Sequence, residues 1–156
     1  MNKPIYIFDI DGTVALIDHR VHILDEKYDS DRWRRFYAAC DQDLPNTPVI
    51  KTMERLKLCG AEILFFSGRS DEVRGKTVEW LAEHTSFMSF ELTPAVLSMR
   101  QLGDYTADDE LKRSWLDGML PEDRNRITAV FDDRDKVVKM WRDSGLCCFQ
   151  VADGNF

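Results

Sequence analysis

Short apolar runs recur along the chain, each with the length of a buried strand. They lie at residues 5–10, 61–66, 95–99, 127–131 and 147–151. Small or acidic polar residues bound most of these runs, which favours strands over buried helices. The pattern therefore predicts five strands.

The segments between the runs carry helix signals. Pro48 stands at a first helical position, Ser70 precedes two acids as a cap, and Gly145 stands where a last helix would end. The predicted helices lie at residues 47–58, from 70 onward, at 106–117 and at 135–145. Strands that alternate with helices predict an α/β fold, with a Rossmann-like parallel sheet of five strands and helices on both faces.

Residues 15–46 interrupt this alternation. They hold a charged stretch and one predicted helix at 31–39, between the first strand and its crossover helix. We interpret this segment as a small cap insertion after strand 1.

Composition narrows the function classes. The 156 residues are expected to form one domain over 1–156, and a 44% hydrophobic fraction can supply its core. The net charge of −7 argues against coating long nucleic acids or anionic membranes. We find no membrane-span run, no signal peptide and no CxxC pair among the four cysteines. A cytoplasmic protein with reduced thiols is therefore expected.

Polar clusters gather where parallel strands end, at the edge where such sheets bind ligands. They are Asp9-Ile-Asp11-Gly-Thr13 after the first strand, Ser67-Gly-Arg69 after the second, Asp132-Asp133-Arg134 after the fourth, and Lys112 in the helix after the third. Carboxylates that converge on one edge repel unless a cation neutralises them. Oxygen ligands of this kind favour Mg²⁺.

The same residues suit phosphoryl transfer. One carboxylate can attack phosphorus while its neighbour moves the proton, a division that suits Asp9 and Asp11. Gly12 allows close backbone approach to an anion. Ser67 and Lys112 offer a hydroxyl and a positive charge to phosphoryl oxygens.

These motifs resemble the four motifs of the haloacid dehalogenase (HAD) superfamily of Mg²⁺-dependent phosphatases. The resemblance extends to the 3′-phosphatase domain of the T-even phage polynucleotide kinase/phosphatase and runs from Pro4 to the C-terminus. It rests further on Arg20, Arg69, Asp108-Asp-Glu-Leu-Lys112, and on residues 131–134, 137–142 and 150–156. The segment before Ser67 is longer than in that family.

The resemblance implies a role for each residue. Asp9 would be the nucleophile, and Asp11 the acid and then the base. Ser67 and Lys112 would hold phosphoryl oxygens. Asp108 would orient Lys112. The implied metal set is Asp9, Asp11 through its carbonyl, Asp132 and Asp133; the implied substrate-binding set is Thr13, Arg20, Arg69, Asp108 and Arg134.

Three other features have two readings each. Residues 32–37 (RWRRFY) interleave bases with aromatics, which fits either a single-strand-binding surface or a cap helix with its aromatics packed inward. His19 and His22 could pair on a metal, but a solvated or cap-packing role is favoured. Residues 75–77 (GKT) fall inside a predicted helix, which disfavours a phosphate loop.

We predict a Mg²⁺-dependent phosphomonoesterase that removes 3′-phosphates from nucleic-acid ends through an aspartyl-phosphate. One alternative is a phosphatase for nucleotides or another small phosphomonoester. Another is a non-catalytic module that docks on a separate kinase. A separate kinase or ligase could be a partner, and the oligomeric state stays open.

Overall fold

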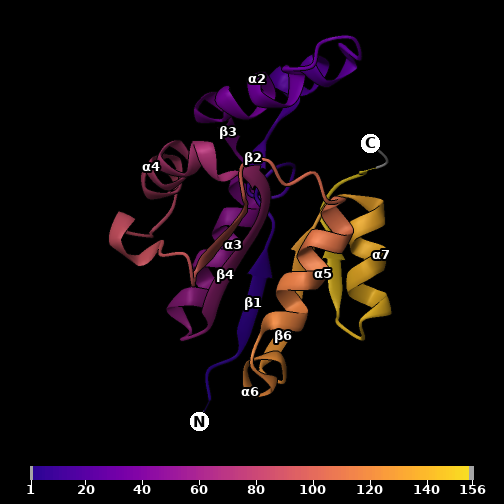
Figure 1. The fold of residues 1–156 in the computed structure, drawn as a ribbon. Coiled ribbons are helices and arrows are strands. Elements are labelled where there is room, and N and C mark those ends of the chain that lie inside the picture. Colours follow the sequence, from indigo (N-terminus) through magenta and orange to yellow (C-terminus); the bar gives the residue numbers. More distant parts are fainter. Residues whose placement is uncertain (1, 155–156) are drawn as a thin grey trace.

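The computed structural model describes residues 2–154 and contains a five-stranded parallel sheet in the order β5-β4-β1-β6-β7 (Figure 1). Its strands are β1 (Ile5–Phe8), β4 (Glu62–Ser70), β5 (Leu97–Arg100), β6 (Ile127–Asp132) and β7 (Cys148–Gln150). The central β1 aligns Ile5 with Glu62 on one side and with Ile127 on the other. The predicted α/β fold with a parallel sheet is confirmed.

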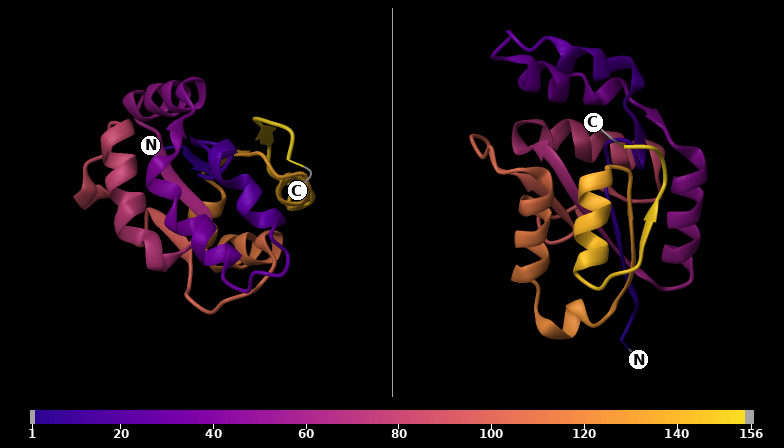
Figure 2. Two further views of the ribbon diagram at one scale, coloured as in Figure 1. Left: turned by 90° about the horizontal axis from the view of Figure 1, so that it is seen from above. Right: turned by 90° about the vertical axis from the view of Figure 1, so that its right-hand side faces the viewer.

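Helices cover both faces of the sheet (Figures 1 and 2). Buried residues of α3 and α4 belong to one hydrophobic cluster, which includes Phe8 and Phe65 of the sheet. Buried residues of α5 and α7 belong to a second cluster with Ile7 and Val130. The helix bounds are α3 (Thr47–Leu58), α4 (Arg74–His84), α5 (Asp108–Gly118), α6 (Pro121–Arg124) and α7 (Asp135–Asp143).

Element boundaries differ from the predicted ones by a few residues. The helix expected from residue 106 begins at Asp108, because Ala107 is still extended at ψ 146°. The Ser70 side chain accepts a hydrogen bond from the Glu72 N–H, as a cap does, but it caps the 3₁₀ turn η3 (Asp71–Val73), and α4 follows at Arg74.

The cap lies over the edge where the parallel strands end (Figure 1). A two-stranded antiparallel sheet joins it to the body, with Ala15 opposite Pro45. The predicted cap insertion is confirmed, and its predicted helix is α2. The cap elements are β2 (Ala15–Leu16), α1 (Asp18–Val21), η1 (His22–Asp25), α2 (Arg32–Ala38), η2 (Cys40–Gln42) and β3 (Leu44–Pro45).

Several smaller expectations have clear outcomes. All four cysteines are free thiols. Residues 75–77 lie within α4, so they form no phosphate loop. Among residues 2–154, no helix is both long and apolar enough to cross a membrane. The last two residues of the 150–156 segment lie outside the described residues.

Candidate active site

The loop after β1 carries the two expected catalytic carboxylates, Asp9 and Asp11. The Gly12 N–H closes this loop by donating to the Ala15 carbonyl at 2.8 Å. Gly12 has a φ of +79°, and a Cβ atom on it would lie 2.0 Å from Oδ2 of Asp133. Both the backbone and the close approach therefore require glycine here.

Three buried carboxylates meet one ammonium group where β1 and β6 end. We call Asp9, Asp132 and Asp133 the acidic cluster; one oxygen atom from each lies within 4.8 Å of the others. Nζ of Lys112 donates to Oδ1 of Asp9 at 2.7 Å and to Oδ2 of Asp132 at 2.9 Å. With every group ionised, three carboxylates against one ammonium leave two negative charges.

Burial of this cluster shifts the pKa values of its members. Burial raises the pKa of Asp9 well above its usual range, and Lys112 only partly offsets that effect. Burial and the neighbouring Asp132 raise the pKa of Asp133 to about 7. Burial lowers the pKa of Lys112, but Asp132 and Asp9 outweigh it, so this pKa is raised. The protein thus supplies too little positive charge to neutralise the three carboxylates.

The acidic cluster fits a hard divalent cation. Oδ1 of Asp133 is buried and has no hydrogen-bond partner among the described residues. A +2 charge would offset the two negative charges, and carboxylate oxygens are the ligands that Mg²⁺ prefers. Asp9, Asp132 and Asp133 would hold such an ion.

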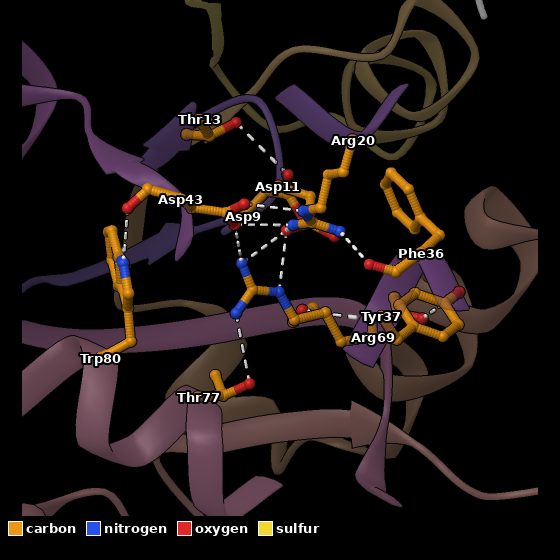
Figure 3. Close-up of polar contacts among 12 residues, drawn as sticks. Asp9, Asp11, Thr13, Arg20, Phe36, Tyr37, Asp43, Arg69, Thr77 and Trp80 are labelled. Atoms are coloured by element: carbon orange, nitrogen blue, oxygen red, sulfur yellow. Dashed lines mark hydrogen bonds and ion pairs between the residues drawn. The ribbon is translucent and has the colours of Figure 1, made fainter. Parts of the chain in front are cut away.

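Asp11 belongs to a second buried cluster, the arginine–aspartate network of Asp11, Arg20, Asp43 and Arg69 (Figure 3). Oδ1 of Asp11 accepts hydrogen bonds from Nη2 of Arg20 at 2.6 Å and from Nε of Arg69 at 2.8 Å. Burial acts to raise the pKa of Asp11, but the charges of Arg69 and Arg20 outweigh it, so this pKa is lowered. Asp11 is therefore an anion in the free protein.

Asp43, which comes from the cap, is the network residue that the sequence analysis missed. It accepts from Nε and Nη2 of Arg20, both at 2.7 Å, and from Nη2 of Arg69 at 2.8 Å. His19 Nε2 also lies 2.8 Å from Asp43, so this histidine packs within the cap. Charge balance is the one signal in the sequence that could have pointed to a further acid, because two buried arginines need more than Asp11 as a counterion.

The remaining predicted residues lie close to these two clusters. Thr13 is fully buried, and its Oγ1 donates to Oδ2 of Asp9 at 3.3 Å. Ser67 is fully buried in β4, where its Oγ accepts from the Arg69 N–H at 3.2 Å. Neither residue lines the cavity described below.

Asp108 makes its shorter contacts away from Lys112. Its carboxylate lies 3.1 Å from Arg100 and 3.5 Å from Arg134, against 3.9 Å from Lys112. A Cβ atom on Gly68 would lie 2.2 Å from Oδ1 of Asp108. Asp108 thus ties the start of α5 to the ends of β4 and β5, and the expected orienting contact is only a long ion pair.

A cavity of about 660 Å³ reaches the loop after β1. Asp9 and Asp11 line it, together with cap residues such as Trp33 and residues of the 100–107 loop such as Tyr105. Carboxylates thus stand at one end of a space much larger than a phosphate group.

Comparison with known proteins identifies the family of this chain. The family model "Polynucleotide kinase PNKP phosphatase domain", a HAD family, matches residues 3–156. The chain belongs to this family. As a PNKP phosphatase domain, it is a HAD-family phosphatase domain.

Two relatives are more than twice as long as this chain. A protein of Autographa californica nuclear polyhedrosis virus, named "Putative bifunctional polynucleotide kinase/RNA ligase", is 34% identical over 136 residues, which are 86% of this chain and 17% of that protein. A chain in "Structure of the Pnkp1/Rnl/Hen1 RNA repair complex" is 30% identical, with a TM-score of 0.76, over 100% of this chain and 46% of that one. The present chain spans less than half of either relative.

A more distant neighbour supports the fold alone. It is "1.7 Angstrom Resolution Crystal Structure of Putative Phosphatase from Clostridium difficile", at a TM-score of 0.63 and 12% identity. That match covers 96% of this chain and 85% of the other.

Proposed function

We propose that this domain is a Mg²⁺-dependent phosphomonoesterase that removes 3′-phosphates from nucleic-acid ends. The observation that carries the proposal is the pairing of Asp9 and Asp11 beside one cavity in a PNKP phosphatase domain. Asp9 lies against Lys112 and Asp11 against two arginines. The two carboxylates therefore stand in different electrostatic surroundings, as a nucleophile and a proton carrier should.

The chemistry divides between them in two steps. An Asp9 oxygen attacks phosphorus, the bond from phosphorus to the 3′-oxygen breaks, and Asp11 delivers a proton to that oxygen. Asp11 then takes a proton from water, whose oxygen attacks phosphorus and releases inorganic phosphate from the Asp9 acyl-phosphate. A bound divalent cation would supply charge to offset the carboxylates and the phosphoryl oxygens.

Asp11 must hold a proton for the first step, although the free protein favours its anion. A dianionic phosphate placed beside it counters the two guanidinium charges and raises its affinity for a proton. Arg20 and Arg69 are both fully buried. We propose that they act on the substrate through Asp11, whose position and charge they set.

Lys112 and Ser67 would hold the phosphoryl oxygens, and both are buried before a ligand binds. Nζ of Lys112 already contacts Asp9 and Asp132, so an incoming phosphoryl oxygen would share its positive charge. The Ser67 hydroxyl accepts a hydrogen bond from the Arg69 N–H through its oxygen, which leaves its hydrogen for a phosphoryl oxygen.

The test compares substrates side by side. The purified domain is given a 3′-phosphorylated oligonucleotide and a panel of nucleoside 3′- and 5′-monophosphates, with Mg²⁺ or with EDTA. We expect Mg²⁺-dependent release of phosphate that is fastest from the oligonucleotide, and none with Asp9→Asn. Faster turnover of the monophosphates would favour the small-molecule phosphatase. No Mg²⁺-dependent activity on any substrate would favour the binding module.

The relatives suggest partners of one kind. One is named as a kinase and ligase, and another lies in an RNA repair complex. Removal of a 3′-phosphate leaves a 3′-hydroxyl, the group that a ligase joins. We therefore propose that a kinase or ligase, on a separate chain or another segment, works with this domain.

A further inference from the structure

The cavity at the loop after β1 is too large for phosphate alone. Its volume of about 660 Å³ lies in the range of sites that enclose a whole small ligand. A phosphate bound at Asp9 would fill only the innermost part. The rest of the space must accept the group to which the phosphate is attached.

The cap side of this space is aromatic. Of the three aromatic residues at 32–37, Phe36 is 4% exposed and packs under Arg20, whose guanidinium carbon lies 4.1 Å from the ring centroid. The Tyr37 hydroxyl donates to the Gly68 carbonyl at 3.1 Å, so its polar end is already bound. Trp33 is 43% exposed and lines the cavity.

The Trp33 indole is also held in place. Its centroid lies 5.9 Å from that of Phe36, edge to face, and 5.8 Å from that of Tyr37. An exposed ring that two neighbours support is a preformed stacking surface, which loses little side-chain entropy when a planar ligand binds it.

The cations that line the cavity are already paired. Arg34 lies 3.4 Å from Glu72, Arg100 3.1 Å from Asp108, and Lys136 3.3 Å from Asp109. Arg134 lies 3.5 Å from the same Asp108. Each cation that lines the cavity thus shares its charge with an acid, which weakens its attraction for additional backbone phosphates. Recognition beyond the scissile phosphate then falls to the apolar wall.

We propose that Trp33 is a specificity-determining residue, against which the base of the 3′-terminal nucleotide stacks while its 3′-phosphate sits at Asp9. This inference rests on the proposed function. Both interpretations of residues 32–37 then apply. Phe36 packs inward as in a cap helix, and Trp33 lines the cavity as in a surface that binds a single strand.

Two substrates that differ only in the terminal base isolate this contact. One is a 3′-phosphorylated oligonucleotide, and the other has the same sequence and 3′-phosphate but an abasic last sugar. Trp33→Ala should lower kcat/KM for the first by about 5- to 150-fold, the range for one base–aromatic stack, and leave the second unchanged. Trp33→Phe should retain most of the activity on the first.

A matched control lies in the same cap. Tyr28 is a fully exposed aromatic residue that does not line the cavity, so Tyr28→Ala should leave both substrates unchanged. If Trp33→Ala slowed both substrates equally, Trp33 would only support the cap and the inference would fall. Equal rates for Trp33→Ala and the wild type on the base-bearing end would also overturn it. Failure of the proposed function is distinct, because the wild type itself would then release no phosphate from either end, or would release it faster from nucleoside monophosphates.

Discussion

Replacement of Asp43 tests the arginine–aspartate network most directly. Its side chain is fully buried and accepts three hydrogen bonds from Arg20 and Arg69, all at 2.7–2.8 Å. Two guanidinium groups are balanced by Asp11 and Asp43, so the network is neutral when intact. Asp43→Asn keeps the shape of the side chain but removes one negative charge and turns one acceptor into a donor that faces a guanidinium.

The expected cost follows from that imbalance. Loss of one partner from a buried ion pair costs about 3–5 kcal/mol, because the remaining charge stays buried without compensation. For a domain of this size, each kcal/mol lowers Tm by about 2–4 °C, so Asp43→Asn should lower Tm by about 6–20 °C. Arg20 and Arg69 would also shift toward Asp11, so kcat should fall even at temperatures where the variant is folded.

Asp41→Asn is the matched control, two residues away in the same cap. Asp41 is 40% exposed and pairs with Lys76 at 3.3 Å, an exposed contact worth about 0–1 kcal/mol. Calorimetry gives Tm for both variants, and phosphate release below both transitions gives kcat. The reasoning would be refuted if the two variants matched in Tm, or if Asp43→Asn lost stability but kept full kcat. A double variant with Arg69→Met should recover part of the lost stability, because it restores charge balance.

Other predictions address the acidic cluster, the paired cations that line the cavity, and the thiols. Asp9→Asn should abolish turnover while its Tm without Mg²⁺ equals or exceeds the wild-type value, because one buried negative charge is removed; a clear drop in scanning calorimetry would count against repulsion in the cluster. EDTA should lower the wild-type Tm by about 5–10 °C relative to saturating Mg²⁺, since a cation at a hundredfold its Kd contributes about 2.7 kcal/mol. The salt dependence of kcat/KM for a 3′-phosphorylated single strand should be weak, because the cations that line the cavity are paired with acids. A plot of its logarithm against the logarithm of salt concentration should have a slope no steeper than about −1.4, the value expected when the protein neutralises two phosphates. A slope twice as steep would show further contacts with the nucleic-acid backbone. Burial raises the pKa of Cys148 to about 12 while Cys147 is exposed, so iodoacetamide at mildly alkaline pH should label Cys147 before Cys148, as peptide mass mapping can show.

The sequence predicted the parts of the site that lie at or near the carboxyl ends of strands. Asp9, Ser67 and Asp132 could be placed on one edge because parallel strands end there, and the structure puts all three among its buried polar residues. Lys112 was placed there less directly, since it lies within a helix and a helix position does not by itself fix which edge a side chain reaches. The structure brings it to hydrogen-bond distance of Asp9 and Asp132.

The contribution of the cap to the site could not be predicted in the same way. No periodicity marks Asp43, because the cap positions it through β3 and a long-range contact with Trp80, whose Nε1 donates to the Asp43 carbonyl at 2.8 Å. The burial of Arg20 and Arg69 was likewise invisible, since arginine is rarely buried without a partner and that partner was unknown. Trp33 and Phe36 are three residues apart, yet only their packing tells which one is exposed.

The two clusters differ in whether the protein alone balances their charges. The arginine–aspartate network is neutral by itself, so Asp11 keeps a fixed position and charge before anything binds. With every group ionised, the acidic cluster has two negative charges that Lys112 cannot cancel, and one Asp133 oxygen has no partner among residues 2–154. A phosphate dianion would be repelled from that cluster alone. Under the proposed function, a cation would therefore bind before or together with the phosphate, whereas the cap and its aromatic wall are formed without either ligand. Mg²⁺ should thus govern the affinity for the phosphate, and Trp33 the affinity for the base, as two separable contributions.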